Sequence, residues 1–123
     1  MANPNMVNVS SILGATAVLI PTTTTATAWT ALTPAVGTVN KIDTMTATNV
    51  TATAATVTVS INSAVSGGGT AYRLTFQTSV PGNASLVVVD KSTMLYVGEA
   101  QSIVVTSGTT NSIEMVATYE AIS

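Results

Sequence analysis

The sequence has neither histidine nor cysteine, and charged residues are few among its 123 positions. Zinc fingers, histidine-based catalytic triads, disulfide frameworks, thiol chemistry and haem ligation all need residues that this chain lacks. Nucleic-acid binding by phosphate neutralisation needs a basic face, which three cations cannot build. We therefore expect no metal site, no cofactor-binding residues and no nucleic-acid partner. The cations are Lys41, Arg73 and Lys91, and the anions are Asp43, Asp90, Glu99, Glu114 and Glu120.

The few acidic residues also argue against catalysis. A glycosidase needs two carboxylates facing each other across a sugar. Glu114 and Glu120 share a predicted strand face, but six residues of strand separate them by about 20 Å. The triple glycine at 67–69 is followed by Thr70 and a strand pattern, so it predicts a flexible hairpin loop and not a phosphate-binding loop. We expect a protein that is not an enzyme and has no catalytic residues.

Threonine and valine are abundant in this chain, whereas charged residues are rarer than in most domains. The chain has 24 threonines and 17 valines, and 46% of its residues are hydrophobic. Both residue types are β-branched and favour strands, and the hydrophobic fraction is far above that of disordered segments. The composition therefore predicts an all-β protein with a packed core.

Alternating apolar residues mark the strands. The clearest is 56–61, with Val57, Val59 and Ile61 on one face. In 71–77 the same alternation predicts that Tyr72, Leu74 and Phe76 point inward. Further strands are expected at 15–20, 38–48, 84–89, 94–97, 101–106 and 113–120, with turns at Gly14, at 49–55 and at 80–83.

This spacing of short strands is typical of two-sheet sandwiches and closed sheets. We expect one domain over 1–123, an antiparallel β-sandwich of about eight strands with jelly-roll or immunoglobulin-like topology. The pattern is weaker in 1–37, so this extended N-terminal segment is expected to supply part of an interface arm.

Four residues of that segment are candidates for an interface. Val7, Val9 and Ile12 are the apolar positions of an alternating stretch that fits a strand or an extended arm. Trp29, the only tryptophan, is either a core anchor or an interface hot spot. Its place between threonine-rich stretches favours the interface.

No targeting or membrane segment is predicted. The first cation is Lys41, so the basic start of a secretory signal is missing, and no apolar run approaches the about 18 residues of a membrane helix. We expect synthesis in a cytoplasm and no membrane partner. With so few lysines to block edge pairing, the strand edges are expected to be covered in an assembly.

Several stretches together resemble a known group of proteins. They are the opening Met1-Ala2-Asn3-Pro4-Asn5-Met6-Val7-Asn8-Val9 with Ile12-x-Gly14-x-Thr16-Ala17, the stretch Val80 to Lys91, the Gly98-Glu99 turn, and the ending Ala117 to Ser123. The chain is similar to small virion structural proteins of tailed phages, notably of phages that infect cyanobacteria. The Thr22–Thr25 tract departs from that pattern.

The resemblance implies a small β-sandwich that decorates or cements a capsid. It implies a location in the virion after synthesis in the host cytoplasm. The major capsid protein or other virion proteins would be its partners, and a homo-oligomer is implied, with a trimer as one candidate. Two alternatives stay open. One is a structural protein of the neck, tail or fibre, and the other is a carbohydrate- or surface-binding module that uses Trp29 or Tyr96.

Overall fold

The computed structural model describes residues 9–123 and contains nine β-strands in that range, with no α-helix among them. Two 3-10 turns, η1 (Thr30–Leu32) and η2 (Val65–Gly67), complete the elements, and no helical segment of the described residues is long and apolar enough to cross a membrane. The strands are β1 (Ile12–Leu19), β2 (Thr27–Ala28), β3 (Val39–Asn49), β4 (Ala55–Asn62), β5 (Ala71–Val80), β6 (Ser85–Val89), β7 (Leu95–Val97), β8 (Ser102–Ser107) and β9 (Ile113–Ile122).

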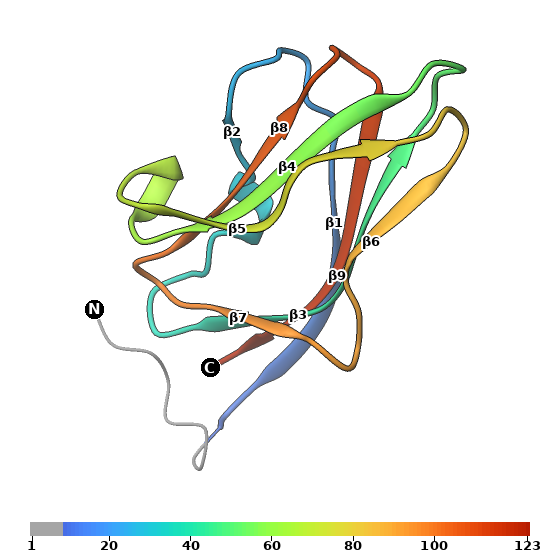
Figure 1. Cartoon of the computed structure of the whole chain (residues 1–123). Coiled ribbons are helices and arrows are strands. Elements are labelled where there is room, and N and C mark those ends of the chain that lie inside the picture. The colour runs from blue at the N-terminus through green and yellow to red at the C-terminus, as the bar shows by residue number, and fades with distance from the viewer. Residues whose placement is uncertain (1–8) are drawn as a thin grey trace.

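The strands form two antiparallel sheets that face each other (Figure 1). One sheet has the order β1-β9-β3-β6, with β7 also pairing with β3, and the other has the order β2-β8-β4-β5. With β7 set aside, the pairs are nested: β4 with β5, β3 with β6, β2 with β8 and β1 with β9. Nested pairing is what a long hairpin gives when it is rolled into two sheets, which is the jelly roll. The predicted antiparallel sandwich is confirmed, and of the two topologies the order is that of a jelly roll.

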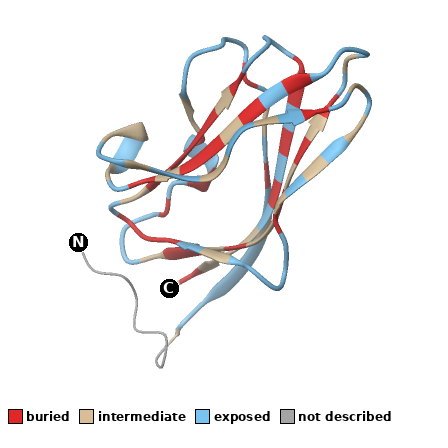
Figure 2. Ribbon diagram, in the orientation of Figure 1, coloured by how far each residue is buried: buried red, intermediate tan, exposed pale blue. Residues whose placement is uncertain are grey.

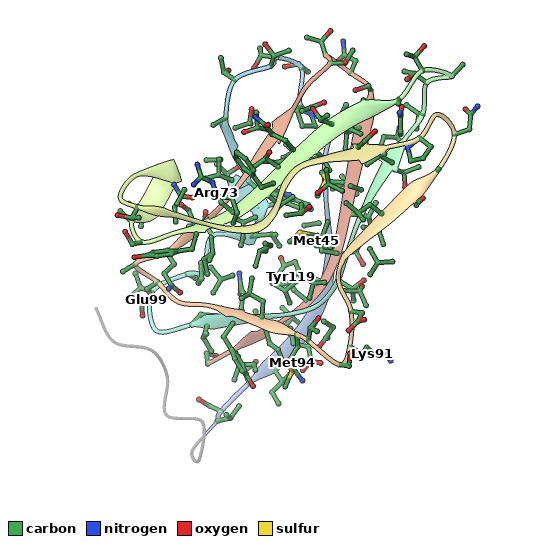
Figure 3. The ribbon with its side chains drawn as sticks, viewed as in Figure 1. Met45, Arg73, Lys91, Met94, Glu99 and Tyr119 are labelled. Atoms are coloured by element: carbon green, nitrogen blue, oxygen red, sulfur yellow. The ribbon has the colours of Figure 1, made fainter. Side chains whose placement is uncertain are left out.

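The core lies between the sheets, where buried residues line the inner faces (Figure 2). The first six residues of β9 alternate strictly, with Ile113, Met115 and Ala117 completely buried and Glu114 and Val116 on the outside. Met45 on β3 and Tyr119 on β9 also point between the sheets (Figure 3). Each fully buried aliphatic side chain contributes about 1.5–3 kcal/mol of hydrophobic free energy. Alternation of this kind therefore fixes which face of each strand is inside.

Strand β5 is the place where the alternation prediction fails. Tyr72 is 62% exposed and Phe76 is 58% exposed, and only Leu74 packs against the core. The pairing of β4 with β5 shifts register twice, and Gln77 has a φ of 45°. Each bulge adds a residue that breaks the two-residue period. The inward placement of Tyr72 and Phe76 was therefore wrong, because periodicity along one strand does not show a bulge in its pairing.

The loop at 63–70 is held against the outer face of the second sheet. The Asn62 amide donates to the Gly67 carbonyl at 2.9 Å, the Gly67 amide donates to the Ser102 hydroxyl at 2.9 Å, and that hydroxyl donates to the Ala64 carbonyl at 2.7 Å. Gly67 and Gly69 take positive φ values of 79° and 71°, which glycine adopts without strain. The triple glycine thus forms an anchored cover over one end of this sheet and not a free loop.

Much of the segment 1–37, expected to be partly an arm, belongs to the sandwich. Strand β1 pairs along its whole length with β9, and β2 pairs with β8. Gly14 lies inside β1, so the turn expected there is absent. The first eight residues lie outside the described residues, and the arm stays a prediction.

Glycine at position 82 is required by close packing. A Cβ atom there would overlap the backbone carbonyl of Ala52, whereas a Cβ at Gly14 would meet nothing within 4 Å. We expect Gly82→Ala to lower the free energy of unfolding by about 1–3 kcal/mol, because the backbone must shift to admit the methyl group. Gly14→Ala is the matched control and is expected to stabilise by about 0.4–1 kcal/mol through the unfolded state. Urea unfolding of the two variants measures the contrast, and equal stability of both would contradict it.

Candidate functional site

The outer face of the β1-β9-β3-β6 sheet is an exposed surface built by strand register. Val18 on β1 pairs with Val116 on β9, Val116 pairs with Thr46 on β3, and Thr46 pairs with Val87 on β6. Paired residues of neighbouring strands share a face and are about 4.7–5.5 Å apart. One row of β-branched side chains therefore crosses all four strands.

The valines of this row face solvent. Val18 is 68% exposed, Val87 is 60% exposed and Val116 is 39% exposed. The next row, Thr16–Thr118–Thr44, continues the same uncharged surface across three strands. We call these two rows the valine–threonine face. A flat, uncharged array of β-branched side chains offers methyl groups and few solvated groups to a partner.

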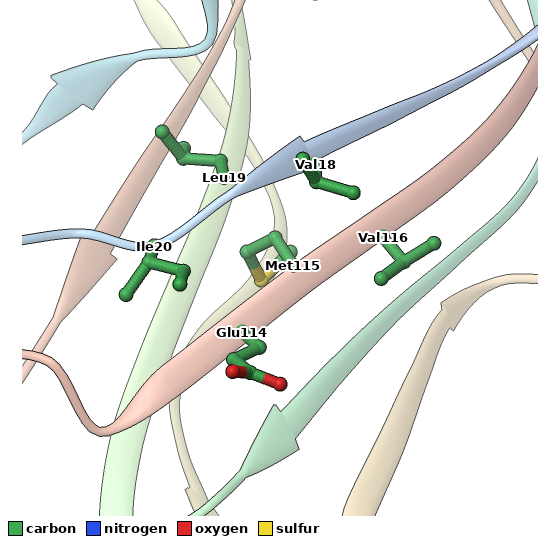
Figure 4. A pocket seen from close by; sticks show the side chains of 6 residues that line it. All are labelled: Val18, Leu19, Ile20, Glu114, Met115 and Val116. Carbon is green, nitrogen blue, oxygen red and sulfur yellow. The ribbon is translucent and has the colours of Figure 1, made fainter.

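A groove opens beside this face where β1 ends (Figure 4). It encloses about 530 Å³ and is lined by Val18, Leu19, Ile20, Glu114, Met115 and Val116. Glu114 is the single charged residue of the lining. The groove therefore extends the apolar part of the valine–threonine face and adds one carboxylate at its border.

Four of the eight charged residues line a second hollow. Lys41 and Asp43 form an ion pair with 3.6 Å between Nζ and Oδ1. Together with Lys91, Met94 and Glu120 they line a hollow of about 290 Å³. Among the described residues no group of three or more acidic side chains is placed to hold a metal ion. The two rows of the valine–threonine face themselves contain no charged residue, and Glu114 and Glu120 of β9 lie at their borders.

Asp90 organises the turn between β6 and β7. Its carboxylate accepts hydrogen bonds from the backbone N–H and hydroxyl of Ser92, at 2.9 and 2.6 Å, and from the backbone N–H of Thr93 at 3.1 Å. These bonds, above all that from the Ser92 hydroxyl, lower the pKa of Asp90 below its ordinary value of 3.8.

A pH dependence follows from this turn. Because the folded pKa is depressed, the stabilisation is present above the unfolded value of about 3.8 and is lost as the pH falls through the folded value. We expect Asp90→Asn to be less stable than the natural chain at about pH 7, and the gap to shrink at about pH 3. Chemical unfolding at both pH values measures this. A gap that widens on acidification would show that the carboxylate does not stabilise the turn.

The four predicted interface residues have different positions. Val7 lies outside the described residues, Val9 is half-buried, and Ile12 is 60% exposed at the start of β1. Trp29 is 1% exposed and belongs to the core between the sheets. Its assignment to the interface is corrected: the indole lies inside, because the backbone N–H of Trp29 bonds to the Ile103 carbonyl of β8 at 2.8 Å and holds the residue against the sheet.

The residues that sequence reasoning missed are Val18, Val87 and Val116. One signal for them was present: Val116 interrupts the outward series of polar residues on β9, between Glu114 and Thr118. That Val18 and Val87 lie in the same row follows only from the register of three strand pairs.

Exposed aromatic side chains form a second feature. The Arg73 guanidinium lies 5.2 Å from the centroid of the Phe76 ring on β5. Tyr72 on the same strand and Tyr96 on β7 are also exposed, the latter by 45%. Rings of this kind stack on cations and on sugars.

No family model matches this chain, and the searches of curated proteins and of solved structures found no match.

Proposed function

We propose that this chain is a non-enzymatic structural protein of a phage particle, most specifically a decoration or cement protein that binds the major capsid protein and stabilises the head. The assignment to a phage particle rests on the resemblance in sequence to virion proteins of tailed phages. The observation that carries the binding role is the valine–threonine face, where three exposed valines and Thr46 form an uncharged row across four strands. The protein acts by binding over neighbouring capsid subunits, and it also associates with further copies of itself.

The face suits binding for energetic reasons. Burial of apolar surface contributes about 25 cal/mol per Å², and rigid strands lose little backbone entropy when they dock. β-branched side chains also have few rotamers to lose. Jelly rolls are used in viral capsids, so the fold agrees with the resemblance to virion proteins. It favours a capsid subunit over a freely diffusing enzyme. Fold alone does not fix function, so the face and not the fold carries the proposal.

A binding assay with purified heads tests the proposal. Heads that lack the protein are mixed with the natural chain or with Val116→Lys, and bound chain is measured after sedimentation. The lysine places a charge in the middle of the row, so we expect a loss of binding of at least tenfold. Val36→Lys is the matched control, because Val36 is an 86% exposed valine outside the face. Equal binding by both variants, or no binding by the natural chain, would refute the proposal.

A carbohydrate-binding module is the second candidate function. Burial of Trp29 removes one of its two expected aromatic residues, while Tyr96 remains exposed and Tyr72 and Phe76 add further rings. Jelly rolls also occur in lectins. Glycan-array binding that is lost in Tyr96→Ala or Phe76→Ala, without loss of head binding, would favour this candidate.

A further inference from the structure

The two sheets have five edge strands among the described residues, and they differ in how well they are protected against pairing. Strand β2 has two residues, β7 has three and β6 has five, and β5 is bent by two bulges. Strand β1 has eight residues in an unbroken antiparallel register with β9. Short length and bulges are the devices by which proteins prevent edge pairing. Of the five edge strands, β1 is the one that is both long and regular.

Strand β1 also lacks the other protective devices. Its residues include no charged side chain and no proline. Apart from its ladder with β9, it makes no hydrogen bond within the described residues. Figure 2 shows its first half as exposed, and Ile12, Leu13 and Val18 are each at least 60% exposed. The outer edge of β1 therefore presents free backbone donors and acceptors between apolar side chains.

We propose that β1 pairs antiparallel with β1 of a second copy of this chain, about a two-fold axis at Ala15. The pairing joins the β1-β9-β3-β6 sheets of the two copies into one continuous sheet. This inference rests on the self-association part of the proposed function and names its partner and its surface. It concerns the free chain, so it fails or holds separately from binding to heads.

The side chains of β1 select both the partner and the register. An axis at Ala15 places Ile12 opposite Val18 of the second copy, twice, so that two exposed apolar side chains meet at each end. It places Gly14 opposite Thr16 at the centre, where the side chains are small. An axis moved by one residue to Gly14 places Ile12 opposite Thr16 and leaves Val18 outside β1 of the second copy. Because the strand carries no charge, self-pairing meets no repulsion.

The contact area is small, and it limits the affinity of the dimer. Pairing of two eight-residue strands buries less than the about 1,200 Å² of a standard stable interface. We therefore expect a dissociation constant of roughly micromolar or weaker for the free chain. High local concentration on a particle would favour the same contact.

Charge-swap variants of the full chain test the pairing by sedimentation velocity over a concentration series. The Ile12→Lys/Val18→Lys and Ile12→Glu/Val18→Glu variants are each expected to dimerise at least tenfold more weakly than the natural chain. Their mixture is expected to recover a heterodimer, because each lysine then faces a glutamate. Val87→Lys is the matched control, as Val87 is equally exposed on the opposite edge of the same sheet. Circular dichroism confirms that every variant is folded.

A cross-link tests the register. The chain has no cysteine, so Ala15→Cys introduces a single thiol at the proposed axis. Mild oxidation is expected to give a covalent dimer with Ala15→Cys and much less with Val87→Cys.

Several results would overturn the inference. They are a natural chain that stays monomeric at millimolar concentration, a trimer, or equal weakening by Val87→Lys. A full chain that is monomeric while a chain starting at residue 9 dimerises would show that the first eight residues cover β1. Val116→Lys separates the two proposals, because it is expected to lose head binding and to keep the dimer.

Discussion

Replacing Trp29 by alanine is expected to lower the free energy of unfolding by about 3–5 kcal/mol. The indole is the largest of the fully buried side chains and lies with Leu32 in the core between the sheets. Truncation leaves a cavity, because a close-packed core relaxes only in part around a deleted side chain. Urea unfolding followed by circular dichroism measures the loss.

The control for this prediction is Trp29→Phe. The indole Nε1 is buried and has no hydrogen-bond partner within the described residues, so phenylalanine removes a polar atom that gains nothing from being buried. We expect Trp29→Phe to cost much less than Trp29→Ala. If alanine at this position costs less than about 1 kcal/mol, the indole does not anchor the core.

Replacing Asn49 by alanine is expected to destabilise the protein by about 3 kcal/mol. Asn49 is fully buried at the end of β3, and its amide donates to the carbonyls of Thr53 and Val80 at 2.8 and 3.0 Å. Its carbonyl accepts the backbone N–H and the hydroxyl of Thr51 at 3.0 and 2.7 Å. Alanine leaves these groups without their partner at a place where water enters poorly.

Two further variants test why the loss of Asn49 destabilises the protein. Asn49→Asp keeps the acceptor and loses the donor, and its charge then faces two carbonyl oxygens, so we expect it to cost at least as much as alanine. Thr51→Val removes one hydroxyl from a half-buried residue and is expected to cost less. The same denaturation assay ranks the three, and a harmless Asn49→Ala would show that the turn holds without the amide.

Much of the fold was predictable from local patterns. Val57, Val59 and the alternating residues of β9 identify their inner faces directly, since period-two burial is a property of a single strand. The bulges of β5 and the anchoring of the 63–70 loop by Ser102 were not predictable, because they depend on contacts between distant segments. The same holds for Trp29, whose weakly patterned neighbours gave no sign that β8 holds it inside.

The candidate site was predictable in part. Ile12 was identified from the sequence, and the structure places it exposed on the open edge of β1. Val116 stood out as an apolar residue in a polar series. The row that joins it to Val18 and Val87 needs the register of β1, β9, β3 and β6, which a single sequence does not contain.

We propose that this chain is an assembly subunit that covers a phage head through the valine–threonine face. Its copy number in purified particles, measured by quantitative mass spectrometry against the major capsid protein, tests this most directly. We predict on the order of hundreds of copies per particle, as repeated capsid symmetry requires of a cement protein. A copy number of about a dozen or fewer would place it at the neck, tail or fibre instead, and its absence from the particle would contradict the account.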